Sequence, residues 1–304
     1  MANVTSLVLV SIGNTRTRVA VARGPGGEFA GAGVTIEPSV VVENSTAGAL
    51  EDAVRDAAAG VEAHRSRVLV ASVADAQVAR VSSALGPDWN VLRLGNGNGG
   101  TVRVPLALNL EGTGGNTVGV DRLLCALAAA ARSGGSPCAV VDAGTCVTVD
   151  FVDEFGVFQG GAIAPGVGMA LRAMHSETSA LPALNPPRKG DDLSWMNDEG
   201  VQGAVGKNTT QAMTLGALNS VRGLVRWQVE HFAELGGRYP RVIATGGDAP
   251  LLFEGDDLVE HVVPDLQLVG MVAAWGILQS GEEAPNANAG GEQPDDADEA
   301  DEEV

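Results

Sequence analysis

The sequence has few aromatic residues: Phe, Trp and Tyr together make up 4% of its 304 residues. A core must therefore be built mainly from Ala, Val and Leu. This composition favours close packing of helices on sheets over a ligand cavity lined by aromatic rings. A chain of this length can form two domains of ordinary size.

Long apolar runs are also missing. No run approaches the roughly 18 residues that a transmembrane helix needs. The first residues lack the basic segment and the apolar stretch of a signal peptide. We therefore expect a cytoplasmic protein that does not bind membranes.

Cysteine and histidine are scarce. The three cysteines, Cys125, Cys138 and Cys146, lie in apolar stretches without the spacing of a metal site, so we expect reduced and buried thiols. The histidines are scattered along the chain, at His64, His175, His231 and His261. They form no zinc or nucleophilic-triad pattern, and a structural or surface role is the preferred interpretation for each.

Basic residues are outnumbered two to one, because 19 Lys and Arg face 38 Asp and Glu, for a net charge of −19. This balance argues against binding to nucleic acid or to an anionic membrane. Residues 281–304 hold ten of the acidic residues and no basic one. We predict that this segment is a disordered tail, which either keeps the protein soluble or docks a partner.

A motif near the N-terminus recurs about 130 residues later, as expected of a duplicated domain. Both "LVLVSIGNT" (7–15) and "CAVVDAGTC" (138–146) run an apolar strand into a glycine turn, with Asp142 in the place of Ser11. Two further extended segments follow each copy, at 18–22 and 27–36 after the first and at 147–152 and 155–166 after the second. The sequence thus predicts two three-stranded meanders.

Helical periodicity follows each meander. We expect helices at 46–60, 75–85, 117–132, 167–179, 209–235 and 266–279, and further strands at 67–73 and 241–248. Asn116 or Thr117 is the expected cap of the third helix. The order βββ-αβα, found twice, is typical of the ribonuclease-H-like (actin-like ATPase) fold. We therefore predict an α/β protein with two duplicated domains, 1–115 and 116–280, that contain mixed sheets and face a ligand cleft.

The glycine turns suit phosphate binding, because glycine lets the backbone approach a ligand and successive N–H groups form an anion-binding concavity. Asn14 and Thr15 add side-chain donors, and Arg16 or Arg18 adds positive charge. In isolation, the first copy is better explained as an ordinary hairpin turn. The second copy, at 142–145, favours a pair of turns that bind two ends of a polyphosphate.

A third candidate lies at the start of the helix expected at 117–132. Asp121 and Arg122 fall in the first turn of this otherwise apolar helix. Either Asp121 compensates the helix dipole beside a solvated Arg122, or Asp121 is a general base and Arg122 orients an anionic substrate. The glycine-rich stretches at 160–166 and 245–248 suit a nucleotide, or are loops without a ligand.

Together these residues resemble the type III pantothenate kinases. Over residues 6–280, six motifs occur in that family's order: "GNT" (13–15), "VGVDR" (118–122), "DAGTCVT" (142–148), "GGAIAPG" (160–166), "GKNT" (206–209) and "ATGGD" (244–248). The resemblance implies a homodimer of the actin-like superfamily that phosphorylates pantothenate with ATP, the first step towards coenzyme A. It also implies Mg²⁺ and a potassium or ammonium ion.

The same resemblance implies roles for individual residues. Asp121 resembles the family's proton acceptor, and Asp142 lies where the family binds the monovalent cation. The implied pantothenate contacts are Gly119, Val120, Asp121, Arg122 and, from the dimer partner's side, Thr209. The implied ATP contacts are Ser11, Ile12, Gly13, Asn14, Thr15, Arg16, Thr17, Arg18 and Thr145.

The first turn departs from the family pattern Asp-x-Gly-Asn-Thr-x-x-Lys. Arg18 keeps the charge of the lysine, although a guanidinium and an ammonium are not interchangeable. Ser11 replaces the aspartate that helps to hold hydrated Mg²⁺ in this superfamily. A carboxylate near a metal is worth about 1–4 kcal/mol, or roughly 5- to 1000-fold in rate.

The family's pocket tyrosine upstream of "VGVDR" is missing as well. Gly112 or a neighbour stands in its place, and the only tyrosine of the chain is Tyr239. We expect a pantothenate kinase. The alternatives are a catalytically weak or inactive relative with a regulatory or binding role, and an actin-like kinase or phosphatase that acts on another small acceptor.

Overall fold

The structure is a computed structural model that describes residues 4–29, 33–72, 75–98, 100–110, 117–197 and 205–281. The acidic tail, the cap residue Asn116 and the position of the missing tyrosine lie outside the described residues.

The first sheet forms around β1 (Ser6–Ile12), whose seven residues are all buried. It also contains β2 (Arg16–Arg23), β3 (Thr35–Ile36), β4 (Val40–Glu43), β5 (Ser66–Ser72), β6 (Val91–Gly95) and β7 (Val102–Arg103). β1 pairs antiparallel with β2 and parallel with β5, which pairs parallel with β6. The strand order is β3-β2-β1-β5-β6-β7, and β4 pairs with β2 as well.

The second sheet repeats this arrangement. Its strands are β8 (Ala107–Leu108), β9 (Cys138–Ala143), β10 (Cys146–Val152), β11 (Val157–Pro165), β12 (Arg241–Thr245) and β13 (His261–Val262), in the order β13-β12-β9-β10-β11-β8. β9 pairs antiparallel with β10 and parallel with β12, as β1 does with β2 and β5. The predicted duplicated, ribonuclease-H-like fold with mixed sheets is confirmed. β8 precedes residue 115 but pairs with β11 of this second sheet.

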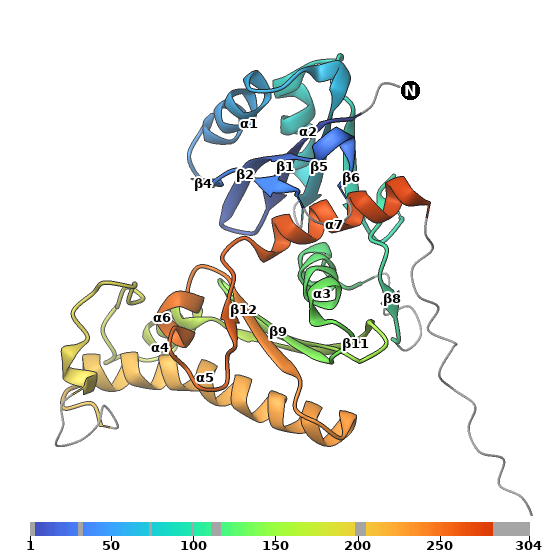
Figure 1. The fold of residues 1–304 in the computed structure, drawn as a ribbon. Coiled ribbons are helices and arrows are strands. Elements are labelled where there is room, and N and C mark those ends of the chain that lie inside the picture. Colours follow the sequence, from blue (N-terminus) through green and yellow to red (C-terminus); the bar gives the residue numbers. More distant parts are fainter. Residues whose placement is uncertain are drawn as a thin grey trace, which may run out of the picture.

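Two helices lie between the sheets, and the others cover the outer faces (Figure 1). The helices are α1 (Ala49–Ala59), α2 (Asp75–Leu85), α3 (Val120–Ser133), α4 (Val167–Ser176), α5 (Thr209–Gly236), α6 (Ala249–Phe253) and α7 (Leu266–Ser280). α1 and α2 cover the first sheet, and α4, α5 and α6 lie on the outer side of the second. α3 and α7 form the middle layer.

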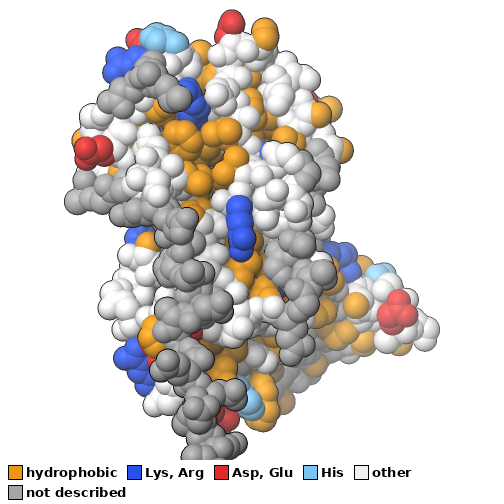
Figure 2. Space-filling model, turned by 90° about the vertical axis from the view of Figure 1, so that its right-hand side faces the viewer, with side chains coloured by type: hydrophobic (Ala, Val, Ile, Leu, Met, Phe, Trp, Pro, Cys, Tyr) orange, Lys and Arg blue, Asp and Glu red, His pale blue; other side chains and the backbone are white. Residues whose placement is uncertain are grey.

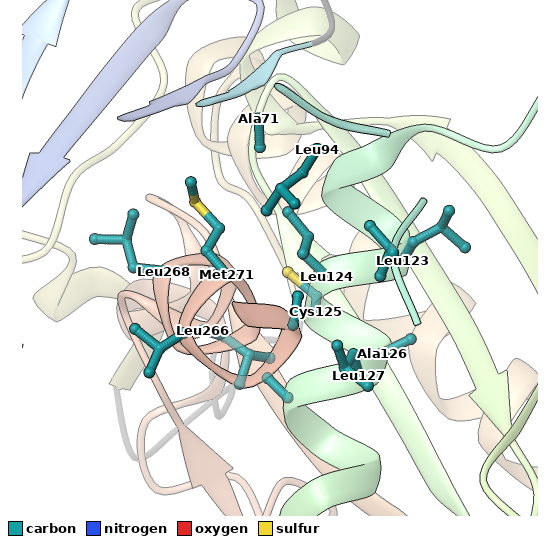
Figure 3. Packing of buried hydrophobic residues seen from close by; sticks show 14 of the residues in the cluster. Ala71, Leu94, Leu123, Leu124, Cys125, Ala126, Leu127, Leu266, Leu268 and Met271 are labelled. Carbon is teal, nitrogen blue, oxygen red and sulfur yellow. The ribbon is translucent and has the colours of Figure 1, made fainter. Parts of the chain in front are cut away.

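This middle layer is the main hydrophobic core. Figure 3 shows Leu124 and Cys125 of α3 facing Met271 of α7, with Ala71 and Leu94 of the first sheet above them. Small and aliphatic side chains fill the space, as the scarcity of aromatic residues predicts. α3 packs on β9 and β10 of the second sheet and α7 packs on β1 of the first, so the contact between the two helices joins the two sheets.

Two local predictions are wrong. α3 begins at Val120 with Gly119 as its N-cap, and not at 117. The reason is the backbone at Gly119, whose ψ of 137° lies outside the helical range, so the helix begins only at the next residue. Cys146 is exposed, unlike the buried Cys125 and Cys138, because it begins β10 on the outward side of the strand alternation.

Among the described helices, none is both long enough and apolar enough to cross a membrane.

Candidate active site

The two glycine turns meet between the two halves of the molecule. The hydroxyl groups of Thr15 and Thr145 lie 3.0 Å apart, within hydrogen-bond distance. Each turn is closed in the same way, since the N–H of Gly13 donates to the carbonyl of Arg16 and that of Gly144 to the carbonyl of Cys146. Two segments far apart in the sequence thus form one polar surface at equivalent strand ends.

The first turn is held in place by Asn44, which follows β4. The Asn44 side-chain amide donates to the carbonyl of Gly13 at 2.8 Å and accepts from the hydroxyl of Thr17 at 2.7 Å. Its backbone N–H donates to the carbonyl of Thr15. Asn44 could not be predicted from the sequence, because no local pattern links it to a turn 30 residues away. Arg16 at the edge of the turn forms an exposed ion pair with Glu43.

Ser11, at the end of β1, contacts the start of α7. Its side chain is 3% exposed, and its hydroxyl donates to Oε1 of Gln267 at 2.7 Å. Arg18 lies opposite Ser11 on β2, and its Nε is 3.3 Å from Oδ1 of Asp265. Asp265 also accepts a hydrogen bond from the hydroxyl of Ser39. The serine therefore joins β1 to the middle layer. Asp265 and Gln267 are not among the residues that the sequence predicts at the site.

Asp142, at the matching end of β9, has a different environment. Burial, followed by the nearby charge of Asp121, raises its pKa to about 6, and Arg18 opposes this shift. The turn after β12 packs against it, because Gly246 has a φ of +96° and a Cβ there would touch Oδ1 of Asp142. The N–H of Asp248 donates to the carbonyl of Ala143. The glycine-rich stretch at 245–248 thus lies beside the second turn.

Asp121 projects from the first turn of α3. Its Oδ1 accepts a hydrogen bond from the N–H of Arg122 at 2.9 Å, and a Cβ on Gly119 would collide with that same oxygen. Glycine at 119 is therefore needed for this orientation of the carboxylate. The charge of Asp121 contributes to the raised pKa of both Asp142 and Asp150, so the three carboxylates share one region.

Arg122 is neither solvated nor free, since it forms a buried ion pair with Asp150 of β10. The side chains of Arg122 and Asp150 are 13% and 2% exposed. Nε of Arg122 lies 3.0 Å from Oδ1, Nη2 contacts the same carboxylate, and the guanidinium lies over the ring of Phe158. Burial raises the pKa of Asp150, and Arg122 opposes the rise. A lone acid in an apolar strand was the signal that could have identified Asp150 from the sequence.

A cavity of about 420 Å³ opens beside the start of α3. It is lined by the ends of β5 and β6, the turn that follows β6, and the residues just before Asp121: Ser72, Arg93, Leu94, Gly95, Asn96, Asn98, Thr101, Val118, Gly119 and Val120. Figure 2 views the side of the molecule on which β6 and β8 lie, where hydrophobic side chains gather in the upper half around a few basic ones. The cavity places space for a small molecule next to Asp121.

Thr209 does not join this group within one chain. It begins α5, after Asn208, whose side chain caps the helix by accepting from the N–H of Gln211. α5 and α3 pack on opposite faces of the second sheet, so the sheet separates Thr209 from Asp121.

The surroundings of Asp142 fit a cation. In the described parts of the chain, no three His, Cys, Asp or Glu side chains converge as a complete metal cage. Mg²⁺, however, is usually held by one or two carboxylates together with phosphate oxygens and water. Burial, followed by the charge of Asp121, raises the pKa of Asp142 and so disfavours the ionised carboxylate, and Arg18 offsets this only in part. A bound cation would favour the ionised carboxylate.

Comparisons with known proteins agree with these features. A sequence profile described as "Type III pantothenate kinase" matches residues 7–231. The type III pantothenate kinase of Akkermansia muciniphila is 38% identical over 161 residues, which are 53% of this chain and 61% of that protein. The type III pantothenate kinase of Rhodospirillum rubrum is 40% identical over 157 residues, which are 51% of this chain and 55% of that protein. The matched region thus spans little more than half the length of these curated relatives.

Among solved structures, a protein of Campylobacter jejuni described as a conserved Baf family transcriptional activator superimposes with a TM-score of 0.52. It is 15% identical in sequence, and the match covers 90% of this chain and 98% of that one. At this level of identity the likeness concerns the fold alone.

Proposed function

Because the chain belongs to the type III pantothenate kinase family, we propose that it transfers the γ-phosphoryl group of ATP to the hydroxyl group of pantothenate. The product would be 4'-phosphopantothenate, an intermediate of coenzyme A biosynthesis. One observation carries the proposal: the contact between Thr15 and Thr145, which joins two equivalent glycine turns at matching strand ends.

The two turns would bind the polyphosphate of ATP. Their backbone N–H groups and the hydroxyls of Thr15 and Thr145 are suitable donors, and Asn14 adds an exposed side-chain amide. Residues 11–18 would form one wall of the nucleotide site. The exposed Arg16 can exchange Glu43 for a phosphate at little cost, because exposed ion pairs contribute little to stability.

A cation would bind at Asp142. The carboxylate of Asp142 and the oxygens of the second turn would hold a monovalent cation or Mg²⁺ beside the phosphates. Such a cation would neutralise the charge that builds up on the transferred phosphoryl group. Ser11 is bound to Gln267 and offers no carboxylate, so Asp142 would carry this role without a matching acid on the first turn.

Asp121 would accept the proton of the acceptor hydroxyl as that oxygen attacks the phosphorus. The rigid first turn of α3 holds the carboxylate in a fixed place, and Gly119 and Val120 line the neighbouring cavity. In phosphoryl transfer, positioning and electrostatic stabilisation provide most of the rate enhancement. Arg122, held by Asp150, would fix this turn against the second sheet.

We further infer a cytoplasmic homodimer. Thr209 lies on the outer face of the second sheet, where it can reach an acceptor only in another copy of the chain. The division into domains 1–115 and 116–280 fits the two sheets, except that β8 crosses to the second one.

The test is ADP formation by the purified protein with ATP, Mg²⁺ and K⁺, with and without pantothenate, and with the product identified by mass. We expect pantothenate-dependent turnover. Asp121→Asn should lower kcat by about 100-fold or more, the range for loss of a general base, whereas Asp56→Asn, on the exposed face of α1, should leave it unchanged. Absence of pantothenate-dependent ADP formation would contradict the proposal.

A further inference from the structure

We infer that Arg93 of β6 recognises the carboxylate end of the acceptor and so determines which acceptor alcohols are used. This inference rests on the proposed function. It assigns the direction in which the acceptor lies: its hydroxyl at Asp121, and its acidic end in the cavity formed by the first sheet.

The lining of the cavity is the first observation. Among its described lining residues, Arg93 is the only charged one. The others are hydroxyl and amide side chains, small residues and short aliphatic side chains. A cavity of about 420 Å³ lies in the usual size range of small-molecule sites. One cation among neutral polar groups is suited to a ligand with one negative charge and internal amide groups.

The second observation is that the other nearby cation is already neutralised. Arg122 follows Asp121, but two of its nitrogens contact the buried carboxylate of Asp150. Removing Arg122 from that carboxylate would leave a buried charge unpaired, which is strongly unfavourable. An anionic group that enters beside Gly119 and Val120 therefore needs a different partner, and Arg93 lines the same cavity.

The third observation is the place of Arg93 in the sheet. It lies in the middle of β6, opposite Val70 of β5 and next to the buried Leu94, a position where an aliphatic residue would pack well. Arg93 also interacts with another part of the protein. A guanidinium has five N–H donors in a planar fork, however, so an arginine with an internal partner can also bind a carboxylate. Arg93 is a partly buried residue, and a carboxylate bound in the cavity would give its charge a task beyond packing.

The chemistry of the acceptor follows from this arrangement. Its terminal hydroxyl lies at Asp121, the amide group in its middle faces Asn96, Asn98 and Thr101, and a carboxylate pairs with Arg93. Pantothenate has these three groups in this order. Its alcohol analogue pantothenol, in which a hydroxyl replaces the carboxylate, would lose only the contact with Arg93.

The experiment compares pantothenate and pantothenol as acceptors for the wild type and Arg93→Gln. We expect Arg93→Gln to raise the KM for pantothenate about 10-fold or more, as expected for loss of a charge-assisted hydrogen bond, and to change the KM for pantothenol less than 2-fold. The kcat for both should stay within about 3-fold, because Arg93 does not touch the reacting atoms. Arg67→Gln, near the start of β5 and outside the lining of the cavity, is the matched control.

Arg93→Lys keeps the charge and provides a second variant if Arg93→Gln fails to fold. It should lie between the wild type and Arg93→Gln in KM for pantothenate. Calorimetric titration of each variant with pantothenate in the presence of ADP gives the affinity without turnover. The thermal unfolding midpoint of each variant is measured alongside.

The outcomes separate this inference from the proposed function. If the wild type phosphorylates pantothenate and the KM values of Arg93→Gln for the two acceptors are both unchanged or rise equally, Arg93 does not read the carboxylate and the inference is wrong. If the wild type neither binds nor phosphorylates pantothenate, the proposed function fails and the inference falls with it. A rise confined to pantothenate supports both.

Discussion

The ends of β1 and β9 are equivalent in the fold but carry different chemistry. At the end of β1, Ser11 is neutral, buried and hydrogen-bonded to Gln267 of α7. At the end of β9, Asp142 is a half-buried carboxylate whose pKa is raised to about 6. Both strands then enter a glycine turn closed by the same kind of backbone hydrogen bond.

This difference shows that the two copies of the hairpin contribute differently to stability. The first strand end contacts the middle helix α7 and gains stability from a satisfied hydrogen bond. The second strand end holds a carboxylate whose burial costs stability at neutral pH. The backbone is duplicated, whereas the charge is present in only one copy.

Among these variants, Asp142→Asn should have the largest effect on activity. If Asp142 binds the cation, the variant should lose about 100- to 1000-fold in kcat/KM, because a carboxylate beside a cation is worth up to about 4 kcal/mol. The measurement is ADP formation as a function of Mg²⁺ and K⁺ concentration. A variant with undiminished activity would remove Asp142 from the site.

The same variant should be more stable than the wild type, in a pH-dependent way. The pKa of Asp142 is raised from 3.8 to about 6, so the native state holds this proton more tightly than the unfolded state. Its contribution to stability is therefore complete below pH 3.8 and is lost as the pH rises through 6. Asp142→Asn should add up to about 3 kcal/mol to the free energy of unfolding at pH 7.5, and about 1 kcal/mol at pH 4.5.

Urea unfolding at the two pH values measures this difference. Asp56→Asn, which replaces an exposed carboxylate, is the control and should change neither value. If Asp142→Asn changes the free energy of unfolding equally at both pH values, the pKa of Asp142 is not raised in the native state.

Ser11→Asp would make the two strand ends alike. We expect kcat/KM to rise about 10-fold or more, with less Mg²⁺ needed for half-maximal rate, because a second carboxylate would face the phosphates. Stability should fall by about 1–3 kcal/mol, since the new acid is buried and Oε1 of Gln267 loses its donor. Ser11→Asn is the control, because asparagine has the size of aspartate but no charge. If it raises activity equally, charge is not the cause.

Thr15→Val and Thr145→Val test whether the two turns bind phosphate equally. Both variants break the same 3.0 Å hydrogen bond, so they should lose the same stability, about 1 kcal/mol or less for an exposed pair. Any difference in their KM for ATP then reports the phosphate binding of each turn alone. We expect increases of about 3- to 10-fold, the larger for Thr145→Val beside Asp142. No change in either KM would show that the contact is purely structural.

Much of the fold follows from the sequence, because strands and amphipathic helices have local signals. The second meander is confirmed, as are helices such as the one expected at 209–235 and found at 209–236. In the first meander, the segment expected at 27–36 forms a strand only at Thr35–Ile36, and β4 was not predicted. The predicted start of α3 is wrong, because Gly119 has a non-helical backbone conformation and forms the N-cap. The predicted domain boundary stays a prediction.

The candidate site was less accessible to sequence reasoning. The glycine turns, Asp121 and Asp142 have recognisable motifs, and the structure places them in one region. Asn44, Gln267 and the ion pair of Arg122 with Asp150 depend on contacts between residues far apart in the chain. Such partners are set by tertiary packing, for which a single sequence has no periodic signal. The assigned roles of all these residues stay proposals.

The smallest expected effect concerns the contact that gives Ser11 its structural task. Ser11→Ala, Gln267→Leu and the double variant form a double-mutant cycle in urea unfolding. Because the hydrogen bond of 2.7 Å is largely shielded from water, we expect a coupling of about 0.5–1.5 kcal/mol, larger than that of the exposed Thr15 and Thr145 pair in the same experiment. If the coupling of Ser11 with Gln267 is instead zero, the serine does not anchor α7. The contrast between the two strand ends would then rest on the missing charge alone.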